Sequence, residues 1–444
     1  MLNFVFEDIN NLRNLYNEEE KLTSGFSRVV MSPYVNRLNQ LRVYYSKLRD
    51  GEEGAIEYFG NEYFINIYDS DKVINEKYII SIGVTQSPEN WIGGRYGKSE
   101  IERNLPDFFS KLSEKYLNDL QNKKAFLLFD SSQEGYFDYF IFDYFHSKCL
   151  EYNISQTQII YVSGNSAIED RLVDWSKKNS IKDLIQVIPY SHFEFDISEV
   201  VRNRTDLNLT KIPNFQDQLD YKSKNIDNIK IYNFLNKKPR HHRIWFYYML
   251  KKYDLLKHGL VSMNSFNTSS DIMIDSSILS KEKIEYALKD LPTYAYGVSN
   301  EIESFRFYMD NLNEQATLDS WFSIVSEAQY EDRQETVFLS EKVFKPIACQ
   351  HPFVILGNKG SLKELKKLGY KTFHDLIDES YDNLNSNDRF HAIKDIINAL
   401  KSNRDKLQWL GWLRPTLEHN SKVLLFNSTF KPPIGFHKLI ELLK

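Results

Sequence analysis

Two series of apolar strands alternating with amphipathic helices constrain the fold of this chain more than any other feature. The first series runs from a strand at residues 78–84 to a strand at residues 185–188. The second series starts with a strand at residues 229–234 and includes the strand at residues 353–356. Strands separated by helices form parallel sheets with right-handed crossovers and with helices on both faces. The pattern therefore predicts an α/β protein with two parallel-sheet domains.

A polar segment separates the two series. Residues 203–227 contain a proline and show no sustained periodicity, as expected of a crossover between domains. The length of 444 residues also favours two domains, because a single hydrophobic core stops growing at roughly 250–300 residues. We expect an N-terminal domain at residues 1–215, beginning with an irregular extension at residues 1–75, and a C-terminal domain at residues 216–432.

Composition narrows the class of protein further. The mean hydropathy of -0.49 is that of a soluble protein, and no apolar run approaches the ~20 residues of a membrane span. The first residues lack a basic region followed by an apolar stretch, which predicts a cytoplasmic chain. Cys149 and Cys349 lie in apolar helical patterns, so we expect two reduced core thiols. The net charge of -5 argues against a globally basic nucleic-acid binder.

Residues 336–360 carry three local signals in succession. Ser340 precedes a helical pattern and can cap it, and Glu341 then occupies the first helical turn, where a carboxylate is favoured. The short apolar strand at residues 353–356 follows, and Gly357 opens a tight loop into another helix. A module of this kind places charged side chains at the carboxyl edge of a parallel sheet, where α/β folds bind ligands.

This module resembles the donor-binding signature of fucosyltransferase-like enzymes. The run Phe-Leu-Ser-Glu-Lys at residues 338–342 matches an aromatic-Val-Thr-Glu-Lys run, and residues 352–357 match a Val-Pro-Val-Val-Leu-Gly strand. Ser326 and Glu327 stand at the place of that family's Glu-Asn, and residues 236–243 precede a helix as its phosphate-contacting arginine does. The resemblance covers residues 229–373.

The resemblance implies two facing Rossmann-like domains of the GT-B type with a deep inter-domain cleft. It further implies a metal-independent glycosyltransferase, moving a hexose or pentose from a nucleotide sugar bound in the second domain to an acceptor hydroxyl. The acceptor would be a glycan or a modified nucleic acid. In the resembled architecture a final helix returns to the first domain, and residues 433–444 have a suitable length. Ser340, Ala328 and Pro346 depart from the family pattern.

A basic cluster lies between a predicted strand and a predicted helix. Its members are Lys237, Lys238, Arg240 and Arg243. Guanidinium forks and the free N–H groups of a helix start suit a pyrophosphate. The alternative interpretation is a solvated basic turn. The resemblance matches Arg243 to that family's phosphate-contacting arginine.

Glu341 and Lys342 offer one acceptor for hydroxyl groups and one cation for phosphate. The alternative is a helix-cap carboxylate beside an exposed lysine, but the following strand, Gly357 and Glu327 upstream favour the binding interpretation. The predicted donor-binding residues are Lys238, Arg240, Arg243, Glu327, Ser340, Glu341, Lys342 and Gly357.

The first series offers candidates for acid–base chemistry. Asp130 and Glu134 follow the strand at residues 125–129, and transfer to a hydroxyl with inversion needs a general base. Gly93, Gly94 and Arg95 form a predicted acceptor or phosphate loop. The alternative for the two carboxylates is helix capping. Glu134 is placed ahead of Asp130 because it lies farther into the loop.

Other interpretations stay open at this point. Asp69 and Asp71 have the Asp-x-Asp spacing that can hold Mn²⁺ or Mg²⁺ against phosphates, but the pair also reads as a hairpin turn, and we expect no metal and no other cofactor. The glycosyltransferase that the resemblance implies has two alternatives. One is a phage-type glycosyltransferase acting on a modified DNA base, and the other is a non-catalytic nucleotide- or carbohydrate-binding protein.

Overall fold

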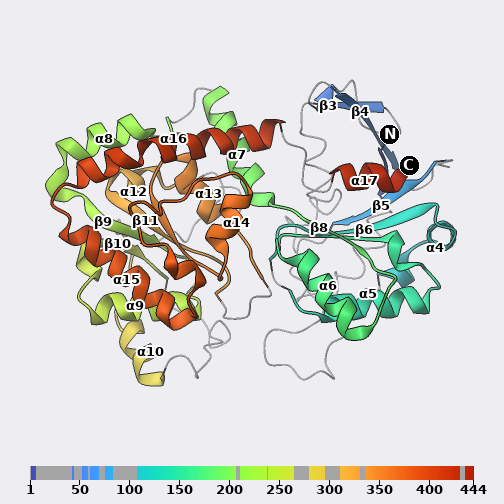
Figure 1. Ribbon diagram of the computed structural model, residues 1–444, viewed down its shortest axis with the longest axis horizontal. Coiled ribbons are helices and arrows are strands. Elements are labelled where there is room, and N and C mark those ends of the chain that lie inside the picture. Colours follow the sequence, from blue (N-terminus) through green and yellow to red (C-terminus); the bar gives the residue numbers. More distant parts are fainter. Residues whose placement is uncertain are drawn as a thin grey trace. The chain divides into compact units, whose positions relative to one another are not determined.

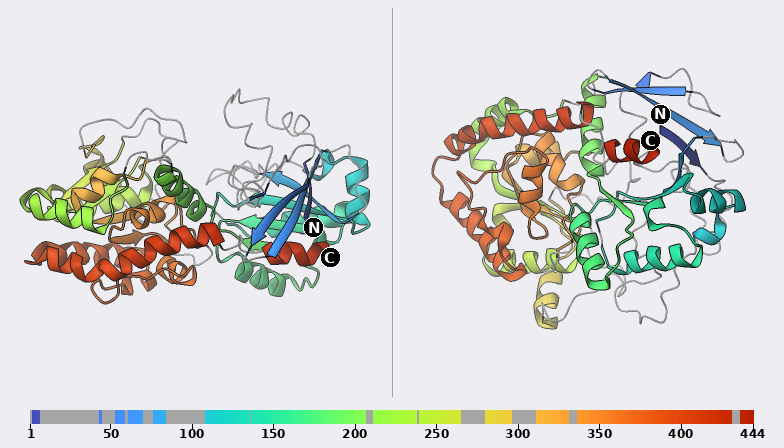
Figure 2. Two further views of the ribbon diagram at one scale, coloured as in Figure 1. Left: turned by 90° about the horizontal axis from the view of Figure 1, so that it is seen from above. Right: turned by 45° about the vertical axis from the view of Figure 1, so that its right-hand side comes forward.

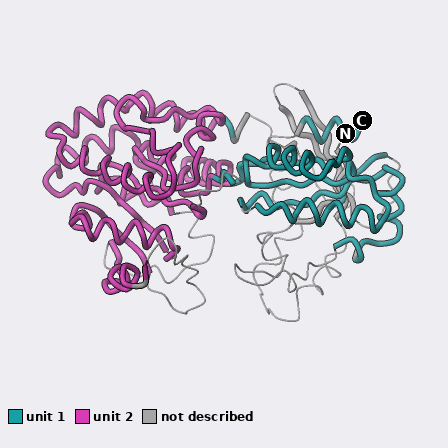
Figure 3. The backbone as a smooth tube through the Cα atoms, turned by 60° about the horizontal axis from the view of Figure 1, so that its bottom comes forward, with its two compact units in different colours: residues 1–192, 335–338, 427–444 teal, residues 193–334, 339–426 magenta. Residues whose placement is uncertain are grey.

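The computed structural model divides the chain into two compact units (Figure 3). Unit 1 comprises Met1–His192, Glu335–Phe338 and Asn427–Lys444, and unit 2 comprises Phe193–Gln334 and Leu339–Phe426. The structure describes residues 2–6, 43–44, 53–58, 61–69, 76–83, 108–135, 137–206, 211–237, 239–264, 280–295, 311–330, 336–430 and 436–444.

Unit 1 contains an eight-stranded sheet in the order β2-β3-β4-β1-β5-β6-β7-β8. The strands from β4 to β8 in this order run parallel, whereas β2 and β3 are antiparallel to their neighbours. The strands are β1 (Leu2–Phe6), β2 (Val43–Tyr44), β3 (Glu53–Tyr58), β4 (Asn61–Asp69), β5 (Tyr78–Gly83), β6 (Ala125–Ser131), β7 (Ile159–Ser163) and β8 (Gln186–Pro189). The helices between them are η3 (Phe109–Lys111), α4 (Glu114–Gln121), α5 (Phe140–Glu151), η4 (Gln156–Gln158) and α6 (Ile168–Asn179). Figure 1 labels α4, α5 and α6.

The prediction of an irregular extension at residues 1–75 is wrong. Four strands come from this region, and β1 lies between β4 and β5 in the sheet. The partners of β1 are more than fifty residues away along the chain, at Ile65 and Ile79 for example. Pairing between segments so far apart is not marked by any pattern in the sequence next to β1.

The central strands of unit 1 are buried on both faces. Every residue of β6 and β7 is buried, as expected of parallel strands covered by helices on each side. Alternate residues of these strands, including Phe129 and Tyr161, pack against α4, α5 and α6. The rings of Phe129 and Phe145 lie 4.9 Å apart between their centroids, which ties α5 to the sheet. Cys149 belongs to the same core and is a free thiol, and Cys349 of unit 2 is also free and buried, as predicted.

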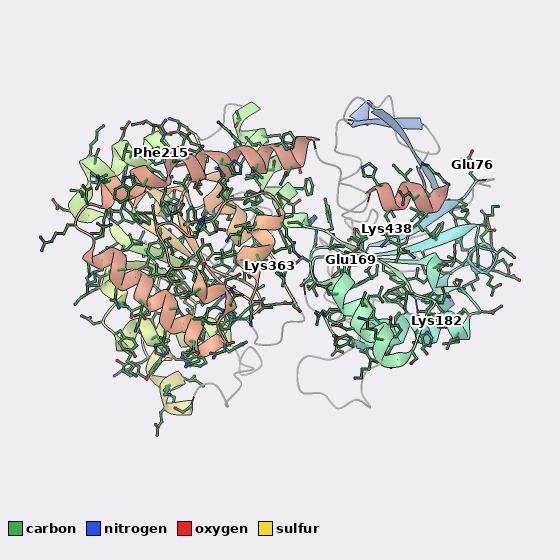
Figure 4. All side chains as sticks on the ribbon, in the orientation of Figure 1. Glu76, Glu169, Lys182, Phe215, Lys363 and Lys438 are labelled. Atoms are coloured by element: carbon green, nitrogen blue, oxygen red, sulfur yellow. The ribbon has the colours of Figure 1, made fainter. Side chains whose placement is uncertain are left out.

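The helix α17 (Phe436–Leu443) belongs to unit 1 and lies beside β1, where Figure 2 shows it in red next to the blue strands. Leu439 of this helix is fully buried. Lys438, labelled in Figure 4, donates from Nζ to the carbonyl of Val187 at 3.1 Å. The terminal helix predicted within residues 433–444 is α17.

Unit 2 contains a four-stranded parallel sheet in the order β10-β9-β11-β12. Its strands are β9 (Lys230–Leu235), β10 (Gly259–Ser262), β11 (Ser320–Ser326) and β12 (Phe353–Leu356). The helices are α7 (His192–Asp206), α8 (Phe215–Lys224), η5 (Ile226–Asn228), α9 (His241–Lys252), η6 (Leu256–His258), α10 (Lys281–Leu288), α12 (Glu314–Leu318), α13 (Glu341–Ala348), α14 (Ser361–Lys367), η8 (Ser380–Asn383), α15 (Ser386–Ser402) and α16 (Lys406–Phe430). The bounds of unit 2 fall within α7 and α16.

The segment predicted as an aperiodic crossover is largely helical and belongs to unit 2. Residues 203–206 end α7, and α8 starts at a capping box formed by Asn214 and Asp217. Gln218 is fully buried and donates to the carbonyl of Cys349 at 2.6 Å. Because α8 buries polar side chains in hydrogen bonds, its inner face does not appear as an apolar stripe in the sequence. The division between the units therefore lies at residues 192–193, whereas sequence analysis placed it at 215–216.

The α/β class with two Rossmann-like sheets is confirmed. Unit 2 has a fully parallel sheet and unit 1 a largely parallel one, with helices connecting the parallel strands. The facing arrangement of the domains and the deep cleft stay predictions. Among the described residues, no helix has the length and apolar character that a membrane span requires.

Candidate functional site

A pocket of about 450 Å³ lies in unit 2 at the carboxyl ends of β9, β10 and β11. Three lysines line it, and Glu314 contributes a carboxylate that forms an ion pair with Arg204. The other lining side chains are mostly amides and hydroxyls. The principal polar residues are Asn233, Asn236, Lys237, Ser262, Asn311, Asn313, Glu314, Gln315, Thr317, Ser323, Ser326, Lys342 and Lys345. The pocket therefore combines positive charge with many neutral hydrogen-bonding groups.

The helix α13 forms one side of this pocket. Lys342, Lys345 and Pro346 are three and four residues apart, so they share one face of the helix, and all three line the pocket. Ser340 is the N-cap, as predicted, and its side chain accepts a hydrogen bond from the backbone N–H of Lys342. The helix thus presents its lysines at the end of the sheet where parallel folds receive ligands.

Glu327 fixes the start of α13. Its carboxylate accepts from Ser340 Oγ at 2.6 Å and from the Ser340 backbone N–H at 2.9 Å. Burial raises the pKa of Glu327, while the Lys342 ammonium and the bonds from Ser340 oppose that rise. Glu327 and Ser340 are predicted donor-binding residues, but they are almost fully buried and bind each other. In the described structure they hold the helix that carries the pocket lysines.

Glu341 pairs with its neighbour Lys342. Lys342 Nζ donates to Glu341 Oε1 at 2.6 Å and to Ser340 Oγ at 3.2 Å. Burial alone would raise the pKa of Glu341, but the ammonium of Lys342 lowers it to about 2. Lys342 lines the pocket, so the ionised Glu341 positions that cation. The predicted contact of Glu341 with a sugar or ribose hydroxyl stays a prediction.

Lys345 was not predicted as a site residue. It lies one turn after Lys342 and is 4% exposed. Burial lowers its pKa to about 8, despite the opposing charges of Glu341 and Glu314. A buried ammonium gains from a nearby anion, because burial has removed the water that would otherwise solvate its charge. The i, i+3 spacing from Lys342 was the signal in the sequence that could have identified it.

The two predicted arginines contact the loop after β11. Arg243 is 3% exposed; its Nε donates to Ser326 Oγ, and its Nη2 donates to the carbonyls of Ser326 and Glu327, all at 3.1 Å. Arg240 is exposed and donates to the carbonyl of Ala328. These contacts fix the carboxyl end of β11 directly beside the pocket. Contact of either arginine with a diphosphate stays a prediction.

Gly357 lies against Glu327. A Cβ at this position would be 3.2 Å from the Cβ and Cγ of Glu327, which is tighter than most packed contacts. The absence of a side chain lets β12 approach the carboxylate that holds Ser340. The structure thus gives Gly357 a packing role next to the pocket, and its predicted donor contact is untested.

The predicted acid–base residues lie at the carboxyl end of β6 in unit 1. Asp130 is fully buried and accepts at Oδ1 from the Ser132 backbone N–H at 2.9 Å. Glu134 is partly buried, and its carbonyl accepts from the backbone N–H of Gly164 at 3.1 Å. The side chain of Glu134 therefore has more access to solvent than that of Asp130. Their catalytic role stays a prediction.

Residues 336–338 belong to unit 1, although they immediately precede the start of α13; we call them the strap. The Val337 backbone N–H donates to Asn165 Oδ1, and its carbonyl accepts from the Ser166 backbone N–H, both at 2.9 Å. The ring of Phe338 lies on Gly135 and Gly164, where a Cβ at Gly135 would be 2.2 Å from Phe338. Sequence analysis assigned these residues to the donor module and did not predict this anchoring.

Several predicted residues lie outside the described part of the chain. These are Gly93, Gly94, Arg95, Lys238 and Asp71, whereas Asp69 ends β4.

No family profile matches the chain, and no curated protein matches it. Solved structures show distant likenesses. A UDP-forming trehalose-phosphate synthase from Burkholderia xenovorans has 10% identity and a TM-score of 0.39, with 96% of each chain covered. The N-terminal domain of trehalose-6-phosphate phosphatase from Candida albicans has 10% identity and a TM-score of 0.38, with 73% of this chain and 66% of that chain covered.

A UDP-GlcNAc 2-epimerase from Neisseria meningitidis, bound to UDP-GlcNAc, has 9% identity and a TM-score of 0.33 over 100% of this chain and 99% of its own. The chain spans slightly less than two thirds of the Candida albicans structure. Because these TM-scores are below 0.5, the likenesses carry no conclusion about the activity of this chain.

Proposed function

We propose that the protein is a glycosyltransferase that moves a sugar from a nucleotide-sugar donor to an acceptor hydroxyl. The observation that carries the proposal is the unit 2 pocket, which combines Lys342 and Lys345 with a lining of amides and hydroxyls. Its volume of about 450 Å³ falls within the ~300–1,000 Å³ range of small-molecule sites. The resemblance of residues 338–342 and 352–357 to a fucosyltransferase-like donor signature gives the same assignment.

The charge distribution fits a leaving nucleoside diphosphate. Negative charge on that group grows as the bond to the sugar breaks, and cations fixed beforehand stabilise the growing charge. Glu341 fixes Lys342, and Glu327 with Ser340 fixes the start of α13, so little reorganisation is needed when the donor binds. Glu134 is the proposed general base, because Asp130 is fully buried.

We propose that the reaction needs no metal, since the pocket lysines supply positive charge for the phosphates. Activity in excess EDTA should equal activity in buffer. Loss of turnover in EDTA, restored by Mn²⁺, would contradict this and favour the pair Asp69 and Asp71.

The function is tested with a panel of UDP-, GDP-, ADP- and CDP-sugars. We expect one donor class to raise the melting temperature, because a ligand that binds only the folded state stabilises it. The same donor should be turned over slowly to free nucleotide without acceptor, and Lys342→Met should reduce both effects. Lys366→Met is a matched control, since this exposed lysine of α14 is outside the pocket. Binding without turnover would instead identify a nucleotide- or carbohydrate-binding protein.

A further inference from the structure

Asn236 occupies the first position after β9, at the edge of the unit 2 pocket. Its backbone N–H donates to the carbonyl of Ser262 at 2.8 Å, which fixes the residue to the neighbouring strand β10. The residue is 8% exposed, and it lines the pocket. The backbone is therefore held in place, and the side-chain amide is buried at the edge of the pocket.

The side-chain amide of Asn236 has no hydrogen-bond partner among the residues that the structure describes. This holds for both Nδ2 and Oδ1. Asn233, three residues earlier in the same pocket, is different: its Nδ2 donates to Ser320 Oγ and to Ser323 Oγ, each at 2.9 Å. Buried amides in proteins are nearly always satisfied, because leaving one unpaired costs stability. The free protein thus keeps an unsatisfied donor and acceptor buried beside the pocket.

The chemistry of the amide restricts the group that it can bind. Phosphate oxygens are acceptors only, so a phosphate would satisfy Nδ2 and would repel Oδ1. The fixed cations Lys342 and Lys345 lie on α13, whereas Asn236 lies on the loop after β9, beside the exposed Lys237. A neutral group with a donor and an acceptor side by side satisfies both atoms of the amide. Vicinal hydroxyls of a sugar or ribose have this property, and so does the polar edge of a nucleobase.

We propose that Asn236 is a specificity-determining residue of the donor pocket and binds such a paired donor and acceptor on the neutral part of the ligand. The inference rests on the proposed function, which supplies the nucleotide sugar. Before binding, the amide is unsatisfied and the free protein is destabilised by it. After binding, two hydrogen bonds form without the loss of any bond within the protein. Ligands without the paired group leave the amide unsatisfied and bind more weakly.

The test compares wild type with Asn236→Leu, in which an apolar side chain of similar size replaces the amide. Because no described protein bond is lost, the melting temperature of the ligand-free variant should equal or exceed that of wild type. Its affinity for the nucleotide sugar, measured by calorimetry, should fall about tenfold, as expected for two neutral hydrogen bonds. Asn233→Leu is the matched variant, and it should lower the melting temperature because it removes bonds to two serines.

Three probes then locate the group that is bound. Inorganic pyrophosphate should bind wild type and Asn236→Leu equally, since it offers acceptors only. If the nucleoside diphosphate already shows the tenfold loss, Asn236 binds the ribose or base; if the loss appears only with the nucleotide sugar, it binds the sugar. Asn236→Ser is a second variant. Its shorter side chain keeps a hydroxyl that cannot reach the ligand groups bound by the amide, so it should also weaken binding.

The outcomes separate this inference from the proposed function. Tight binding of the nucleotide sugar by wild type and Asn236→Leu alike would overturn the role of Asn236 and leave the proposed function intact. A lower melting temperature of ligand-free Asn236→Leu would also overturn it, because the amide would then be stabilising the free protein. Failure of wild type to bind any nucleotide sugar would overturn the proposed function together with this inference.

Discussion

The carboxyl ends of the two parallel sheets are built in opposite ways. In unit 1, the strap covers the ends of β6 and β7, with the Phe338 ring against Gly135 and Gly164. In unit 2, the ends of β9, β10 and β11 surround a pocket lined by lysines and amides. One edge is thus partly filled by the protein's own aromatic side chain, whereas the other is left open and polar.

The comparison shows that the carboxyl edge of a sheet can be filled to add stability or kept open for a ligand. Filling an edge with an aromatic ring adds buried apolar area and stabilises the unit. At the open edge, the ammonium of Lys345 is buried away from water and the amide of Asn236 is unsatisfied, which costs stability but prepares both for a ligand. We therefore expect substitutions at the unit 1 edge to act on stability and substitutions at the unit 2 pocket to act on binding.

The largest effect is expected from Phe338→Ala. Truncating a buried phenylalanine typically costs about 3–5 kcal/mol, because the apolar area is lost and a cavity remains. Chemical denaturation followed by circular dichroism measures the loss. Gly135→Ala should also destabilise the protein, since its Cβ would meet Phe338 at 2.2 Å.

A double-mutant cycle sharpens this result. In Gly135→Ala/Phe338→Gly both the ring and the Cβ of residue 338 are gone, so the added methyl group has space, and the double variant should lose less than the sum of Gly135→Ala and Phe338→Gly. Additive losses would show that the ring does not lie on Gly135.

Arg243→Ala should have the next largest effect on stability. It tests whether this buried side chain holds the carboxyl end of β11 beside the pocket. The guanidinium donates to two backbone carbonyls and to Ser326 Oγ, and hydrogen bonds from charged groups contribute about 1.5–3 kcal/mol. We expect a loss of roughly 3 kcal/mol in the ligand-free protein. Arg240→Ala is the matched control; because Arg240 is exposed, it should cost less than about 1 kcal/mol. An unchanged stability of Arg243→Ala with reduced turnover would instead indicate direct contact with the diphosphate.

The smallest effect concerns the pH dependence of binding through Lys345. Burial lowers its pKa to about 8, so below pH 8 the pocket carries an additional positive charge. Affinity for a nucleoside diphosphate should therefore decrease as pH rises through about 8. Stability should change in the opposite direction: between pH 8 and the unfolded pKa of about 10.4 only the unfolded chain holds the proton, so unfolding becomes harder as pH rises.

Lys345→Met should abolish this pH dependence of affinity, and isothermal calorimetry at several pH values measures it. Glu341, Lys342 and Glu314 surround the same group, and Lys342→Met is the comparison because Lys342 is paired with Glu341. An affinity that falls with pH equally in Lys345→Met would exclude Lys345 as the titrating group.

The sequence predicted the regular part of the fold because its signals are local. The strand at residues 353–356 coincides with β12, and the helix predicted from Ser340 onward is α13, because an apolar run and a cap each lie within a few residues. The strand β1 was missed because its partners are distant. The helix α8 was missed because Gln218 and Lys222 are buried through hydrogen bonds rather than through apolar contacts.

The site residues were predicted only in part, because a sequence shows residue types and spacing but not the hydrogen bonds of the folded chain. The charges of Glu341 and Lys342 were visible in the sequence, but Arg243 donates to two backbone carbonyls and to Ser326 Oγ, and no sequence pattern marks these acceptors. The missing partners of Asn236 are a property of the folded pocket alone. Residue type and spacing indicate which groups can bind a ligand, whereas the hydrogen bonds already formed determine which groups remain available.

Unit 1 is made of three separate parts of the chain, and this determines when it can be completed during synthesis on the ribosome. This unit needs its first 192 residues, the strap and residues 427–444, whereas unit 2 is almost continuous. The strands of unit 1 therefore leave the ribosome well before α17, which supplies the buried Leu439 and the bond from Lys438. Unit 2 has left the ribosome by then, so the first domain begun is the last completed. A premature stop that removes only α17 would strand the earliest part of the nascent protein in an unfinished state exposed to chaperones and proteases.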